Sequence, residues 1–94
     1  MILNSFLKQN KVTLTNIQKM ALGRRVISCY KTMQINGLIG EKELKKVGIN
    51  ENGIKMEVYD YPREFFETKN FKAVANKFFC QNKVKVNGVL FQLK

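Results

Sequence analysis

The side chains in this sequence that could carry out acid–base or metal chemistry are few. The chain contains no His, which is the residue that titrates near neutral pH and the commonest metal ligand. Its absence excludes His-based catalytic triads, Cys/His zinc sites and His-dependent nucleases. One group of carboxylates could bind Mg²⁺, namely Glu57, Asp60, Glu64 and Glu67. Capping, charge pairing and solvation explain these acids more simply, so we expect no catalysis, no metal, no cofactor and no small-molecule substrate.

The two cysteines, Cys29 and Cys80, lie fifty-one positions apart. We place both on apolar helical faces, where a free Cys behaves as a small hydrophobic residue. The sequence alone leaves a disulfide between them as an alternative, but it favours reduced thiols in a cytoplasmic protein. The N-terminal apolar run, MILNSFLKQNK, is too short for an export signal or a membrane span. We therefore expect a cytoplasmic protein with no membrane partner.

The basic residues are numerous and unevenly distributed. The net charge is +10, and all seven acids lie between Glu41 and Glu67. Residues 1–40 and residues 68–94 each contain six bases and no acid. If the two ends come together in the fold, they form one positive surface that attracts a polyanion, of which nucleic acid is the commonest. The alternative is a solvated lysine-rich surface that serves solubility.

An arginine pair lies in the middle of a predicted helix over Thr13–Met33. At about 100° per residue, five apolar residues fall on one side and five polar residues on the other. Thr13 and Thr15 are candidate N-caps. The apolar face is predicted to enter the core and the polar face to meet an anion. The apolar set is Leu22, Val26, Cys29, Tyr30 and Met33, and the polar set is Arg24, Arg25, Ser28, Lys31 and Thr32.

The earlier apolar residues of this segment point to a different side of the helix. Ile17, Met20 and Ala21 are out of phase with the later set, so one straight helix would expose one of the two groups. We therefore predict a break near Gly23. A break there favours a helix-turn-helix whose second helix begins near Arg24 and enters the major groove. A single kinked surface helix is the alternative.

The chain up to residue 80 is predicted to alternate turns with short elements. Residues 41–47, EKELKKV, are predicted as a charged helical turn closed by Gly48, followed by a loop over 50–53. From Ile54 the apolar residues alternate, which predicts a half-buried strand that ends at Pro62. Residues 63–80 are predicted as a helix, interrupted near 68–70. Its apolar positions recur at helical spacing and are assigned to the core: Phe71, Val74, Ala75, Phe78 and Phe79.

The last twelve residues, KVKVNGVLFQLK, carry a hairpin signal. Asn87-Gly88 suits a two-residue turn, which directs Lys83 and Lys85 outward. A lysine-bearing hairpin after a helix resembles the wing of a winged-helix protein, whose cations hold phosphates. An edge hairpin whose lysines deter aggregation is the alternative. We predict one α+β domain over residues 1–94, with two main helices packed on a short antiparallel sheet and a C-terminal β-hairpin, which could form a winged helix.

Two segments of the chain resemble a known family. LGRRVISCYKTM at 22–33 and EVYDYPREFF at 57–66 resemble a segment of bacteriophage antirepressor-type regulators, which show a Leu-Gly-Lys/Arg helix, a Tyr near its end and a strand closing in Tyr-Pro. The matching positions are Gly23, Arg24, Arg25, Tyr30, Tyr61 and Pro62. The resemblance implies a DNA-binding regulator of phage or mobile-element origin. Those proteins usually carry a larger N-terminal domain, which this sequence does not include.

These observations favour a sequence-specific regulator of transcription, a repressor, that binds double-stranded DNA as a homodimer. Arg24 and Arg25 are the candidates to read guanine, because the guanidinium fork matches the O6 and N7 of that base. The candidate phosphate contacts are Lys31, Lys72, Lys83 and Lys85. One alternative is a small basic inhibitor that binds an acidic surface of a host or phage protein. The other is an RNA-binding protein that stacks bases on Tyr30, Tyr59 or Tyr61.

Overall fold

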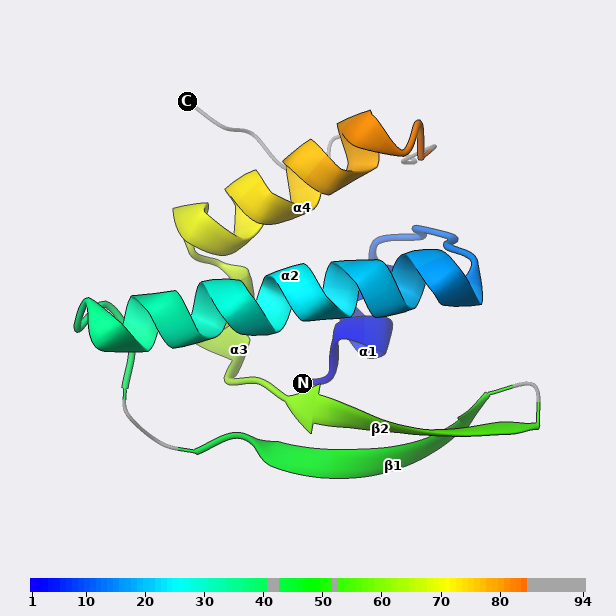
Figure 1. The fold of residues 1–94 in the computed structure, drawn as a ribbon, viewed down its shortest axis with the longest axis horizontal. Coiled ribbons are helices and arrows are strands. Elements are labelled where there is room, and N and C mark those ends of the chain that lie inside the picture. Colours follow the sequence, from blue (N-terminus) through cyan, green and yellow to red (C-terminus); the bar gives the residue numbers. More distant parts are fainter. Residues whose placement is uncertain (41–42, 52, 85–94) are drawn as a thin grey trace.

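The computed structural model describes residues 1–40, 43–51 and 53–84 of the chain. Over these residues the protein forms four helices and a two-stranded antiparallel sheet (Figure 1). The predicted α+β class is confirmed. The predicted C-terminal hairpin, with its Asn87-Gly88 turn, lies outside the described residues except for Lys83 and Val84, which are not in a strand and follow the end of α4. In chain order the elements are α1 (Leu3–Gln9), α2 (Asn16–Ile35), β1 (Lys45–Glu51), β2 (Ile54–Asp60), α3 (Arg63–Phe66) and α4 (Lys69–Gln81).

Helix α2 is the longest element and runs without a break for 20 residues. It begins at a capping box: the Thr15 hydroxyl oxygen accepts from the Gln18 N–H at 3.1 Å, and the Gln18 side chain accepts from the Thr15 N–H at 3.0 Å. Thr15 is therefore the N-cap, and Thr13 is not. These two reciprocal bonds satisfy donors that the first turn would otherwise leave unpaired.

The predicted break at Gly23 is wrong, and so is the helix-turn-helix that depended on it. A glycine inside a helix costs only about 1 kcal/mol relative to alanine. Burial of Leu22 before it and Val26 after it on the same side of α2 outweighs that cost. The unbroken helix leaves the out-of-phase residues in solvent, so Ile17 is 80% exposed and Met20 is 51% exposed.

Strands β1 and β2 form a hairpin, of which only the second strand was predicted. The strand beginning at Ile54 is confirmed, but the helical turn and loop predicted over 41–53 are wrong for the described residues 45–51, which form β1. Lys45 pairs with Asp60 and Glu51 pairs with Ile54, so only Asn52 and Gly53 separate the strands. Gly53 has φ 80°, which glycine adopts without steric cost. Pairing with β2 therefore overrides the helical propensity of the charged EKELKKV segment.

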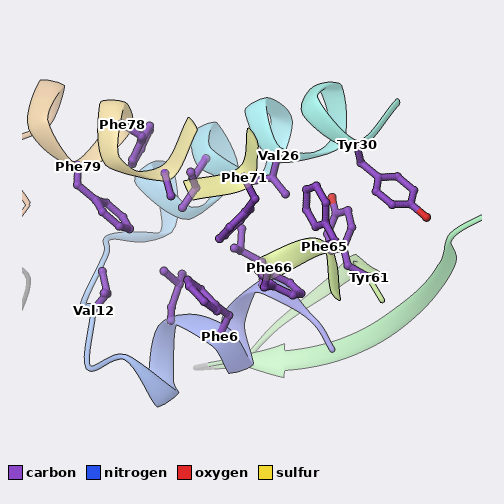
Figure 2. Packing of buried hydrophobic residues seen from close by; sticks show 14 of the residues in the cluster. Phe6, Val12, Val26, Tyr30, Tyr61, Phe65, Phe66, Phe71, Phe78 and Phe79 are labelled. Carbon is purple, nitrogen blue, oxygen red and sulfur yellow. The ribbon is translucent and has the colours of Figure 1, made fainter. Parts of the chain in front are cut away.

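The core is a cluster of aromatic rings that joins all four helices to the end of β2 (Figure 2). Phe71 of α4 lies with its ring centroid 5.0 Å from that of Phe6 in α1 and 4.9 Å from that of Phe66 in α3. Tyr30 of α2 meets Phe65 of α3 at 5.2 Å. Edge-to-face pairs at these separations add to the energy of burial. The four-residue helix α3 is thus held by its two phenylalanines. The predicted core of α4 is confirmed for Phe71, Ala75, Phe78 and Phe79, but not for Val74, which is half-buried and lines the groove between α2 and α4.

Helices α1 and α4 end in the same sequence pattern, FLKQNKV at 6–12 and FFCQNKV at 78–84. In each helix the Asn side chain donates to the carbonyl of the Phe four residues earlier, at 2.8 Å for Asn10 and 2.9 Å for Asn82. The following lysines, Lys11 and Lys83, have φ 55° and 51°. The valine N–H then bonds back into the last turn, as in a Schellman motif. Both helix ends lie at the same end of the molecule (Figure 1).

The Gly23→Ala variant tests the continuity of α2. We expect it to raise the free energy of unfolding by about 0.5–1 kcal/mol, because alanine is the better helix former and no atom lies within 4 Å of the added Cβ. Gly37→Ala is the matched control, since Gly37 has φ +69° and should lose about 1 kcal/mol. Urea denaturation measures both. A lower free energy of unfolding for Gly23→Ala than for wild type would indicate that α2 is broken at Gly23.

The Phe71→Ala variant tests the aromatic core. We expect it to lower the free energy of unfolding by about 3–5 kcal/mol, because it removes a fully buried ring and leaves a cavity. Ile35→Ala, at a side chain that is 85% exposed, should change stability by no more than about 0.5 kcal/mol. Thermal unfolding followed by circular dichroism compares them. Similar values for the two variants would contradict this description of the core.

Candidate nucleic-acid interface

A groove of about 700 Å³ runs between α2 and α4. Its basic side chains are Arg24 and Arg25 from α2 and Lys77 from α4. None of the described residues that line it is acidic. Hydroxyl and amide groups, which proteins use beside Arg and Lys to bind phosphate oxygens, share the lining with the less polar side chains of Cys29, Met33, Ala73 and Val74. The main polar contributors are Ser28, Thr32 and Asn36 on the α2 side and Asn70 and Gln81 on the α4 side.

Arg25 is held in place across this groove. Its Nη1 donates to the Gln81 side-chain oxygen at 2.8 Å, and its guanidinium carbon lies 5.3 Å from the centroid of the Phe78 ring. A guanidinium has five N–H donors, so the bond to Gln81 leaves others for an anion. Arg25 therefore both links α2 to α4 and presents a fixed positive charge.

Arg24 differs from its neighbour because it is exposed and has no carboxylate partner among the described residues. It lies about 100° around α2 from Arg25, toward the outer face of the helix. Ser28 and Lys31 lie within about 40° of it on that face. The Arg24 guanidinium therefore points toward the outer face of α2, whereas the bond to Gln81 holds the Arg25 guanidinium toward α4.

The other predicted contacts lie away from the groove. Lys31 is exposed but borders the side of α2 that faces Leu44 and Tyr59. Lys72 is half-buried and lies about 140° around α4 from Lys77, given about 100° per residue. Lys83 is exposed beyond the end of α4. Lys85 lies outside the described residues.

Lys77 was not among the predicted site residues, although the groove depends on it. The available signal was the spacing of polar residues along α4, because Asn70, Lys77 and Gln81 recur at seven and four residues and share one helical face. On α2 the polar residues at 25, 28, 32 and 36 have a similar spacing. Each pattern identifies a polar face. Neither pattern indicates that the two faces meet, because that depends on how the helices pack.

Charge is segregated across the fold. Helices α1, α2 and α4 contain no acidic residue, whereas the described acids lie on the hairpin, in the segment before it, and in or directly after α3. The packing of α2 against α4 brings together the two acid-free ends of the sequence. The described parts of these two basic ends therefore lie together in the fold, which is what a single positive surface requires.

Two of the three tyrosines named as candidates for stacking RNA bases are buried in the core. Tyr30 is 1% exposed and Tyr61 is 4% exposed, and both pack within the aromatic core. Burial raises the pKa of Tyr61 well above its ordinary range, with smaller contributions from Tyr59, Cys29 and Tyr30. Tyr59 is half-buried with the Lys46 ammonium 5.6 Å from its ring centroid. Base stacking on Tyr30 or Tyr61 would require opening the core.

Cys29 and Cys80 are both free. Cys29 is half-buried in the wall of the groove, and burial raises the pKa of its thiol. Cys80 is exposed, so its predicted place on an apolar face is wrong. Among the described residues, no three acids or cysteines gather closely enough to hold a metal ion. Within the same residues, no helix combines the length and apolar character needed to cross a bilayer.

The chain matches no protein-family model, and the searches of curated proteins and of solved structures also gave no match.

The Arg25→Ala variant tests the link between α2 and α4. We expect it to lower the free energy of unfolding by about 1 kcal/mol through loss of the hydrogen bond and the cation–π contact. Gln81→Ala should cost about half as much, because it removes the hydrogen bond alone. Arg24→Ala is the control and should change stability by less than about 0.5 kcal/mol. Equal effects of Arg24→Ala and Arg25→Ala would show that Arg25 does not join the helices.

Proposed function

We propose that this protein is a regulator that binds double-stranded DNA at a specific sequence and represses transcription. In this proposal it has a phage or mobile-element origin and acts in the cytoplasm as a homodimer. The observation that carries the proposal is the acid-free groove in which Arg24, Arg25 and Lys77 converge from two helices. The resemblance of residues 22–66 to phage antirepressor-type regulators supports the same class. Occupancy of a site by a small protein blocks access to it, which favours repression.

In this proposal the two arginines have different roles. Arg25, fixed by Gln81 and Phe78, contacts a phosphate and sets the position of the helices on the duplex. Lys77 contacts the backbone from the opposite wall. Phosphate contacts of this kind give affinity and register without reading sequence. Arg24 supplies specificity by pairing with a guanine in the adjacent major groove.

The dimensions of α2 are compatible with this arrangement. Twenty residues span about 30 Å, which exceeds the major-groove width of about 12 Å, so only part of the outer face enters. Arg24 and Lys31 are seven residues apart, or about 10 Å along the axis. This outer face therefore fits one groove while the inter-helical groove holds the neighbouring backbone. Because α2 does not turn at Gly23, its first half extends past the part of the helix that contacts the DNA.

The test is binding of the full chain to duplex pools, measured by fluorescence anisotropy after rounds of enrichment at low and near-physiological salt. We expect one motif to be enriched. Arg24→Ala should cost about 1–3 kcal/mol on that motif and little on random DNA. Lys77→Ala should weaken binding to all sequences and reduce the salt slope by about 1.

Lys55→Ala is the matched control, because Lys55 is an exposed lysine of β2 that does not line the groove. It should leave affinity and salt slope unchanged on both DNAs. Binding that disappears at near-physiological salt and enriches no motif would contradict the proposal. That result would favour an acidic protein partner or a charge that serves solubility.

A further inference from the structure

Helices α1, α2 and α4 end in the same backbone turn. In each of them the C-cap residue is asparagine and the residue after it has a positive φ. The next N–H bonds to the carbonyl five residues back: Val12 to Leu7 at 2.9 Å, Leu38 to Met33 at 2.9 Å and Val84 to Phe79 at 3.0 Å. The residue with positive φ is Gly37 after α2, but Lys11 after α1 and Lys83 after α4.

A lysine at this position of the turn carries a backbone cost that glycine avoids. In the left-handed region a Cβ crowds the following carbonyl oxygen, which is why glycine is favoured there. A cation near the negative end of a helix dipole offsets only part of that cost. The chain uses glycine at the end of α2. Because strain of this kind persists where function requires it, the lysines after α1 and α4 indicate a role for their charge.

The two lysines lie at the same end of the molecule. Helices α1 and α4 both end there (Figure 1), and Figure 2 shows Val12, the residue after Lys11, pointing toward Phe79. Val84, the residue after Lys83, packs against the same core and bonds to the Phe79 carbonyl. The valines anchor both turns to one part of the core, and both lysine side chains are exposed.

This end of the molecule continues the groove between α2 and α4. Gln81, which holds Arg25 across the groove at 2.8 Å, is the last residue of α4 and lines the groove. Lys83 follows two positions later. Neither Lys83 nor Lys11 has a carboxylate at ion-pair distance within the described part of the chain. Positive charge therefore continues from Lys77 and Arg25 past the end of α4 to these two lysines.

We propose that Lys11 and Lys83 form a second phosphate-binding pair, which holds the DNA backbone where it leaves the groove between α2 and α4. The pair, whose role rests on the proposed function, extends the contact surface of that groove. A lysine ammonium binds phosphate as a point charge on a flexible stem. Such contacts add affinity and register on all sequences alike.

The Lys11→Gly, Lys83→Gly double variant tests this pair, because glycine keeps the turn and removes the charge. We expect it to raise the melting temperature by about 4 °C, since it relieves the left-handed strain. The same variant should weaken binding to a random duplex on the order of tenfold at near-physiological salt and reduce the salt slope by about 2. A purely structural role for the lysines cannot produce greater stability together with weaker binding.

Lys45→Ala with Lys55→Ala is the matched control, because it removes the same charge from exposed positions of the hairpin. It should leave affinity and salt slope unchanged. A glycine variant that binds duplex with the affinity and slope of wild type would overturn the lysine pair and leave the proposed function standing. A glycine variant that melts at or below the wild-type temperature would show that the lysines serve stability, and would also overturn it. A wild type that binds no duplex would contradict both proposals.

Discussion

The burial of one side of α2 is the constraint on which the rest of this structure depends. Leu22, Val26, Tyr30 and Met33 lie on that side and are almost completely enclosed by the aromatic core. Because the helix is continuous, enclosing one side presents the opposite side to solvent along its full length. That outer side carries Arg24, Ser28 and Lys31, while Arg25 lies on the flank toward α4. Helix α4 and the hairpin then lie on either side of α2 (Figure 1), and each flank acquires its own chemistry.

The two flanks of α2 differ in the kind of side chain that lines them. Between α2 and α4 the lining mixes basic and polar side chains with apolar ones, including Met33, Ala73 and Val74. One of its arginines is fixed by Gln81, and the other has no carboxylate partner among the described residues. Between α2 and β2 the lining is mostly apolar. Electrostatic contacts weaken with salt, whereas apolar burial does not. The two flanks therefore present different chemistry, and Arg24 borders both of them.

Patterns confined to one element were predictable from the sequence. The buried residues of α2, four of the five predicted core residues of α4 and the strand from Ile54 follow from helical and alternating periodicity. Periodicity does not choose between Thr13 and Thr15 as the N-cap of α2. The break at Gly23 was inferred from the assumption that every apolar residue is buried, which Ile17 and Met20 violate. Residues 45–51 were misassigned because strand pairing overrides local charge pattern, although Asn52-Gly53 is a recognised hairpin signal. Lys77 was missed because its role requires α2 as a neighbour, and that proximity is a product of the fold.

The proposed function requires nucleic acid to bind between α2 and α4. The most direct measurement is a titration of ¹⁵N-labelled protein with a short duplex, following backbone amide shifts by NMR at near-physiological salt. We expect the largest perturbations at residues 24–32 of α2 and 70–81 of α4, with the amides of β1 and β2 unaffected. Perturbations confined to the hairpin, or spread evenly over all lysine-bearing surfaces, would contradict it.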